Sequence, residues 1–312
     1  MLDITLLGTG GGMPMPNRHL SSTIITYNGR KILFDCGEGT QVAMRKWRTG
    51  FRSIDIILLT HFHGDHTFGL PGLLATIGNS DRRKPIIVIG PAGLKYIMSS
   101  VLNLTGKLPF DIKLIEEPKM KLGFNIKTEI LELVNQDKSE LYISNINLEH
   151  SSQCLGYKIY VPRSPKFNPQ KAIEYDIPVK YWSILQSGRE VEYNGRIFKA
   201  NMVLGEEREG LTFSYVTDSR PNDQITEFVR DSNYLVCEGT YGDDADLDKA
   251  RKNTHMTFSE AAELAKAANV DKLLLTHFSP SMDSMEKYRE ETTRIFKNTI
   301  IGYDGYKESI TY

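Results

Sequence analysis

The stretch LLTHFHGDHTFGLPGLL, residues 58–74, places three histidines and an aspartate within six residues, directly after an apolar run. Alternate residues of an extended chain point the same way, so His61 and His63 can face one ligand together. Asp65 and His66 follow in a turn, and the chain then enters a helix through Gly69 and Leu70. Imidazole and carboxylate groups in this spacing indicate a metal site, with zinc favoured and Mn²⁺ or Fe²⁺ also compatible.

Three further ligand candidates stand at the ends of apolar segments: His150 ends INLEH, Asp218 ends TFSYVTD, and His277 ends KLLLTH. A single histidine at a strand end is more often a packed or surface residue than a ligand. That explanation is poor for three strand-end candidates that occur together with the dense motif. The seven candidates exceed what one tetrahedral ion needs and suit two ions about 3.5–4 Å apart with open positions. A structural zinc site would be closed and cysteine-rich, so a hydrolytic site is favoured.

Composition limits the class of protein. The 312 residues carry a net charge of -1, so an anionic partner needs a local patch or metal ions. The N-terminus lacks a basic region typical of signal peptides, and no run of 18 apolar residues predicts a membrane span. The three cysteines, Cys36, Cys154 and Cys237, lie far apart and fit a reducing cytoplasm.

Short apolar segments alternate with polar turns along most of the chain. Five strands are expected before residue 92, helices near 39–48 and 69–79, hairpins between 124 and 161, and three more strands towards the C-terminus. Thr257 and Glu260 form a capping box that predicts a helix to about Ala268. The pattern favours an α/β fold with two facing sheets and helices outside.

Residues 162–210 differ from the rest, with four of the 13 prolines, little periodicity, and eight Lys/Arg against seven Asp/Glu. Asn194-Gly195 predicts a hairpin turn within this segment. The segment is therefore expected to be an inserted arm of a single domain covering 1–312. Either a solvated excursion or a binding arm fits it.

The motif THFHGDH resembles the signature of the metallo-β-lactamase superfamily, whose fold is an αββα sandwich with metal ligands on loops along one edge. The resemblance implies that His61, His63 and His150 hold one ion. It also implies that Asp65, His66 and His277 hold the other, with Asp218 bridging.

Further segments resemble the ribonuclease Z family of tRNA 3′-processing endonucleases, and the match runs from the first strand to the last ligand. They are LLGTGGGMPMPNRHLSS, LFDCGEGTQ, GLPGLL, VTDSRP, CEGTY and HMTFSEAA. The chain departs from the family pattern at Val179–Trp182, where a Gly-Pro pair is common, at VTDSRP, and at FSPSM after His277. The resemblance implies two Zn²⁺ per subunit, a precursor tRNA substrate, a flexible arm that grips tRNA, and a homodimer.

For a phosphodiester, Asp65 is expected to orient or deprotonate the attacking water. His255, just before the capped helix, is the candidate that protonates the leaving 3′-oxygen. The positive end of the helix disfavours the imidazolium, and Glu238 is the carboxylate expected to offset this. The alternative reading of Glu238 is an ordinary surface carboxylate.

Substrate contacts are expected from two regions. Arg18 lies in the first loop, and Arg45, Lys46 and Arg48 cluster around Trp47, where a solvated helix face fits equally well. Lys180 and Trp182 are the candidates in the arm.

Two other functions stay open. One is a small-molecule hydrolase acting on a cyclic nucleotide, an aryl sulfate or a lactone at the same dinuclear site. The other is an RNA-binding protein that has lost its chemistry, which the complete ligand set disfavours.

Overall fold

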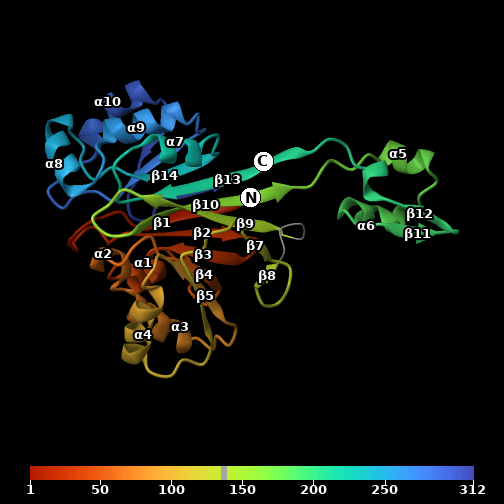
Figure 1. Ribbon diagram of the computed structural model, residues 1–312, viewed down its shortest axis with the longest axis horizontal. Helices are drawn as coiled ribbons and strands as arrows, with labels where there is room; N and C mark the ends of the chain where they lie inside the picture. The colour runs from red at the N-terminus through yellow and green to blue at the C-terminus, as the bar shows by residue number, and fades with distance from the viewer. Residues whose placement is uncertain (135–138) are drawn as a thin grey trace. The chain divides into compact units, whose positions relative to one another are not determined.

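The computed structural model describes residues 1–134 and 139–312. They form two compact units, one of residues 1–160 with 212–311 and the other of residues 161–211 with Tyr312 (Figure 1). The boundaries of the second unit lie within one residue of the expected arm, 162–210.

The first sheet of the larger unit has seven strands in the order β17-β1-β2-β3-β4-β5-β6. Neighbouring strands from β3 to β6 run parallel, and β17, β1, β2 and β3 pair antiparallel. The strands are β1 (Leu2–Gly8), β2 (Ser22–Tyr27), β3 (Arg30–Phe34), β4 (Ile54–Leu58), β5 (Ile86–Gly90), β6 (Ile112–Glu116) and β17 (Lys307–Ile310).

The second sheet has eight strands in the order β16-β15-β14-β13-β10-β9-β7-β8. Its hairpin half, from β7 to β10, is antiparallel as expected, whereas β13 to β16 run parallel. The strands are β7 (Leu122–Asn125), β8 (Glu132–Val134), β9 (Leu141–Leu148), β10 (Cys154–Arg163), β13 (Arg208–Val216), β14 (Tyr234–Glu238), β15 (Leu273–Thr276) and β16 (Thr299–Ile301).

Helices cover the outer face of each sheet, which confirms the predicted αββα sandwich (Figure 1). Between the sheets, the Phe34 ring of β3 packs against Tyr215 and Phe213 of β13, with centroids 4.8 and 5.3 Å apart. The helices of this unit are α1 (Thr40–Lys46), α2 (Gly64–Thr67), α3 (Leu70–Gly78), α4 (Leu94–Thr105), α7 (Asp223–Val229), α8 (Leu247–Asn253), α9 (Phe258–Ala267) and α10 (Arg289–Ile295).

The capping box predicted for α9 is present. The Thr257 hydroxyl accepts a hydrogen bond from the Glu260 amide at 3.2 Å, and the Glu260 carboxylate accepts one from the Thr257 amide at 3.0 Å. This fixes the N-cap of α9 at Thr257, directly after residues 254–256, so the segment that carries His255 is held in place.

The smaller unit has an apolar cluster of its own, built around Leu185, Val191 and Phe198. Its elements are α5 (Pro169–Glu174), α6 (Trp182–Gln186), β11 (Val191–Tyr193) and β12 (Arg196–Phe198). The hairpin turn predicted at Asn194-Gly195 is confirmed, with φ values of 52° and 73°.

In the part of the chain that the structure describes, no helix is both long and apolar enough to cross a bilayer.

Candidate metal centre

The predicted ligands meet at one edge of the two sheets. His61 and His63 follow β4, and Asp65 and His66 lie in α2. The remaining three come within two residues of the ends of β9, β13 and β15. Asp218 and His277 have positive φ values of 51° and 60°, which non-glycine residues rarely adopt. Backbone strain of this kind is typical of functional sites and here turns both side chains towards the shared edge.

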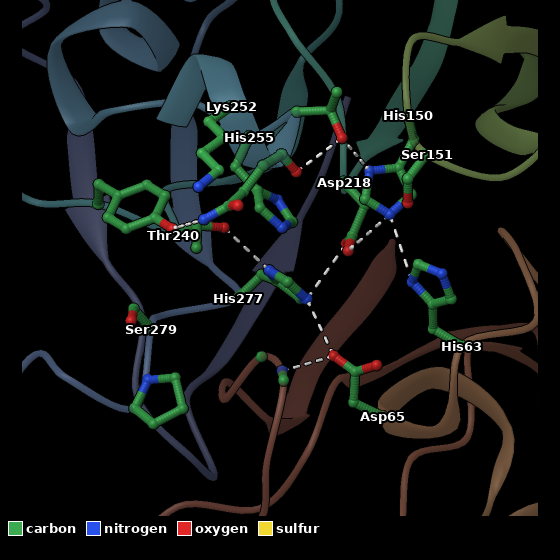
Figure 2. Close-up of a pocket in the computed structure, with 16 residues that line it drawn as sticks. His63, Asp65, His150, Ser151, Asp218, Thr240, Lys252, His255, His277 and Ser279 are labelled. Atoms are coloured by element: carbon green, nitrogen blue, oxygen red, sulfur yellow. Dashed lines mark hydrogen bonds and ion pairs between the residues drawn. The ribbon is translucent and has the colours of Figure 1, made fainter. Parts of the chain in front are cut away.

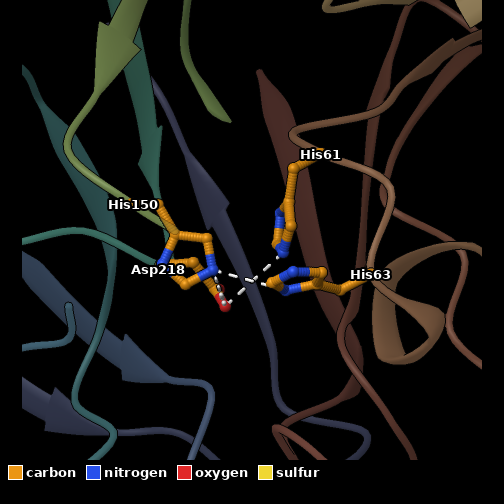
Figure 3. Close-up of side chains that lie close together, drawn as sticks. All are labelled: His61, His63, His150 and Asp218. Atoms are coloured by element: carbon orange, nitrogen blue, oxygen red, sulfur yellow. Dashed lines mark hydrogen bonds and ion pairs between the residues drawn. The ribbon is translucent and has the colours of Figure 1, made fainter. Parts of the chain in front are cut away.

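One group of ligands consists of His61, His63, His150 and Asp218 (Figure 3). Its ligand atoms all lie within 4.8 Å of one another. The His150 Nε2 is 3.3 Å from the His63 Nδ1, and the Nε2 atoms of His61 and His150 are each 3.7 Å from the Asp218 Oδ2. In Figure 3, His61 and His63 face His150 and Asp218 from the opposite side.

The second group consists of Asp65, His66 and His277. The Nε2 atoms of the two histidines are 3.1 Å apart, and each is 3.5 Å from the Asp65 Oδ2. They also lie 3.3 and 3.1 Å from the Asp218 Oδ1. Asp218 therefore faces the first group with one carboxylate oxygen and the second group with the other.

The donor set fits metal ions. Two ligand atoms bound about 2.1 Å from one tetrahedral ion lie about 3.4 Å apart, close to the separations found here. The Nε2 of the fully buried His61 has no hydrogen-bond partner among the described residues, although it points at Asp218. Burial and neighbouring histidine charges lower the pKa of His61 to about 2, which keeps the imidazole neutral, as a metal ligand must be.

In four of these histidines, Nε2 faces the ligand group and Nδ1 contacts a neighbouring side chain that orients the ring. Such partners fix the tautomer so that the remaining nitrogen faces the metal. They are Thr60 for His61 at 3.1 Å, Asp35 for His66 at 2.8 Å, Thr254 for His150 at 2.8 Å, and Thr240 for His277 at 3.0 Å.

These four partners are not among the residues predicted from the sequence. Asp35 ends the strand KILFD just as Asp218 ends its own strand, so a signal was present. The Asp35 carboxylate is fully buried, accepts a hydrogen bond from the Thr60 amide at 2.8 Å, and contacts the His66 Nδ1.

Replacing Asp35 with asparagine is expected to lower metal affinity about 10- to 100-fold, because an amide holds the His66 ring less firmly than a carboxylate. Competition against a chromogenic chelator measures the change. The exposed Asp223, replaced in the same way, is the control and should leave the affinity unaltered. Wild-type affinity in Asp35→Asn would contradict the orienting role.

His255 and Glu238 lie together, with the His255 Nδ1 3.1 Å from the Glu238 Oε1. Burial lowers the pKa of His255, but the charge and hydrogen bond of Glu238 outweigh it and raise the pKa to about 9. Glu238 is fully buried and also accepts hydrogen bonds from the Ser219 and Met256 amides, so the surface-carboxylate reading is wrong. His255 also forms a potential ligand group with Asp218 and His277.

A cavity of about 400 Å³ opens over these groups (Figure 2). The first loop forms one wall, where the Gly12 amide donates to the Asp65 Oδ2 at 2.6 Å. A Cβ atom at Gly11 would lie 2.4 Å from the His277 ring, so only glycine fits there.

None of the predicted substrate-binding residues lines this cavity. The Arg18 guanidinium donates to the carbonyls of Phe278, Ser279 and Met282, which gives it a structural role in holding the loop after His277. Arg45, Lys46 and Arg48 are exposed at or just after α1.

In the smaller unit, the Trp182 ring packs against Phe167 and its Nε1 donates to the Ile177 carbonyl at 2.9 Å. The exposed Lys180 lies over the rings of Tyr181 and Tyr193. Substrate contact by any of these residues stays a prediction.

Comparison with known proteins gives the chain its family. A family model described as anti-Pycsar protein Apyc1 matches residues 2–109. Ribonuclease Z of Alkaliphilus oremlandii is 50% identical over 315 residues, covering 100% of this chain and 99% of the relative. Ribonuclease Z of Clostridium tetani is 49% identical, covering 100% and 99%.

Among solved structures, the short form of human tRNase Z superposes with a TM-score of 0.67 at 24% identity, covering 99% of this chain and 100% of that one. That likeness supports the fold, and the full-length identity to the bacterial relatives supports the closer relationship. The chain belongs to the ribonuclease Z family.

Proposed function

We propose that this chain is a zinc-dependent endoribonuclease that hydrolyses the phosphodiester at the 3′ side of tRNA precursors and so removes the 3′ trailer. The observation that carries the proposal is the pair of ligand groups facing the two oxygens of Asp218, in a chain 50% identical along its whole length to a ribonuclease Z. This function accounts for both the ligand groups and the relationship.

The centre would hold two Zn²⁺ ions, with Mn²⁺ or Fe²⁺ as possible replacements. His61, His63 and His150 would bind one, Asp65, His66 and His277 the other, and Asp218 both. When bound, the ions supply Lewis-acid catalysis at the phosphoryl oxygens and lower the pKa of water towards 7.

The chain's own residues supply orientation and proton transfer. Asp65, held by the Gly12 amide, would orient the attacking water at the cavity wall. His255 would protonate the leaving 3′-oxygen, because it lines the cavity and its Nδ1 is engaged by Glu238, which leaves Nε2 for the substrate. Glu238 is a positioning residue in this scheme.

The unit of residues 161–211 would be an arm inserted into a single domain, and would bind tRNA. Its own apolar cluster and exposed cations suit a binding module with a core of its own. The segment Val179–Trp182, which lacks the Gly-Pro pair common in the family, forms a short helical turn that leads into α6. Two chains would assemble as a homodimer, and the three unpaired cysteines suit the cytoplasm.

Cleavage of two substrates tests the function. Zinc-loaded protein is incubated with a tRNA precursor carrying a 3′ trailer and, separately, with a chromogenic phosphodiester. Cleavage of the precursor is expected. Hydrolysis of the ester alone would favour the small-molecule hydrolase, and tight precursor binding without cleavage would favour the non-catalytic RNA-binding protein.

Deleting residues 165–205 tests the arm, because it removes the whole apolar cluster of the smaller unit. Loss of a second binding element should lower kcat/KM for the precursor about 100-fold, while small-ester hydrolysis continues. Steady-state assays on both substrates measure the difference. Equal loss on both would mean that the segment only stabilises the fold.

A further inference from the structure

The charge of the cavity wall is uneven. Apart from the histidines, its charged residues are the acidic Asp65 and Asp218 and one cation, Lys252. No other lysine or arginine lines this cavity among the described residues. A polynucleotide brings one negative charge per linkage, so phosphates beside the reacting one need a cation outside the metal centre.

Lys252 is free to supply that cation. It is exposed at the end of α8, and within the described part of the chain no carboxylate lies within ion-pair distance of its ammonium group. Lys249, one turn earlier on the same helix, is instead paired with Asp246 at 2.6 Å and does not line the cavity. The two lysines therefore form a matched pair, one unpaired at the cavity and one paired away from it.

The backbone at Lys252 is fixed relative to the reacting groups. The Asn253 amide side chain donates to the Tyr241 hydroxyl at 2.7 Å, and Thr254, in a left-handed conformation with φ of 58°, contacts the His150 Nδ1. The His255 amide donates to the Ala250 carbonyl at 2.8 Å. Four consecutive residues, 252–255, thus link the end of α8 to the metal ligands and to Glu238.

Lys252 lies on the same side of the cavity as His255 and across from His63 (Figure 2). His255 is proposed to protonate the leaving 3′-oxygen, which belongs to the nucleotide on the 5′ side of the scissile phosphate. Lys252 therefore lies on the side of the cavity where the 5′ part of the RNA strand would bind. Lysine is a compact point charge that binds phosphate oxygens without needing bidentate geometry.

We propose that Lys252 is a specificity-determining residue that binds the phosphate immediately 5′ of the scissile linkage. The proposal rests on the proposed endonuclease function. Lys252 would then recognise a continuous RNA strand that has at least two nucleotides on the 5′ side of the cut.

Lys252→Gln should raise KM for the precursor roughly tenfold, the effect of losing one hydrogen bond to a charged group, with the loss falling mainly on KM. Because one phosphate contact is removed, the slope of log KM against log salt should fall by about 0.7. Lys252→Arg should restore most of the affinity, and Lys249→Gln should behave as wild type.

A neutral methylphosphonate placed at the 5′ linkage of the precursor identifies the partner. In wild-type protein it should raise KM by a similar factor, and in Lys252→Gln it should cause no further rise. The proposal would be overturned if the methylphosphonate and Lys252→Gln raised KM by factors that multiply when the two are combined. An unaltered KM in Lys252→Gln would overturn it as well. Failure of wild-type protein to cleave the unmodified precursor would instead refute the endonuclease function.

Discussion

Replacing Asp218 with alanine is expected to abolish metal binding at both ligand groups and to lower kcat/KM by roughly 1,000-fold or more. The reason is geometric, because the two carboxylate oxygens face different histidine pairs. Removing several kcal/mol of Lewis-acid stabilisation corresponds to at least three orders of magnitude in rate. Metal content by mass spectrometry and precursor kinetics measure both effects.

The control for this change is Asp223→Ala, which removes an exposed carboxylate five residues later. It should leave metal content and rate near wild type. Circular dichroism of both variants establishes that the sandwich is folded. If Asp218→Ala kept two equivalents of metal, the shared-ligand arrangement would be incorrect.

His255→Ala should lower kcat by about 100- to 10,000-fold, the usual contribution of a positioned general acid. Metal content should stay near that of the wild type, because the proposed ligand sets are complete without this imidazole. The imidazole of His255 acts on the leaving oxygen in this account, so the defect should shrink on a substrate with an acidic phenol as leaving group.

Metal analysis of the same variant separates two roles for His255. Its ring lies close enough to Asp218 and His277 to act as a ligand. Loss of metal in His255→Ala would assign it to the metal centre and would contradict the proton-donor role. Retained metal together with a slow precursor reaction is the predicted result.

Much of the fold follows from local signals. The five early strands and α9 were predicted because apolar alternation and the Thr257–Glu260 capping box act within a few residues. The helix α4 was missed, although Leu94, Met98 and Val101 have helical spacing and are buried. The short strands β6, β16 and β17 were missed too, since their pairing depends on neighbours distant in sequence.

The functional site likewise contains residues that the sequence predicts and residues that it does not. Its seven ligand candidates are predictable because four of them fall within six residues and the other three each end an apolar segment. The orienting partners were not, because a threonine such as Thr240 or Thr254 becomes informative only once its contact with a histidine is known. The sequence predicts a substrate contact for Arg18, yet its guanidinium donates to backbone carbonyls whose positions the sequence does not reveal.

The most direct test of the central claim is the identity of the products. A precursor tRNA with a 3′ trailer, incubated with zinc-loaded protein, should yield two fragments by mass spectrometry: tRNA ending in a 3′-hydroxyl and an intact trailer beginning with a 5′-phosphate. Stepwise release of single nucleotides, or no cleavage by protein that hydrolyses a small phosphodiester, would contradict the claim.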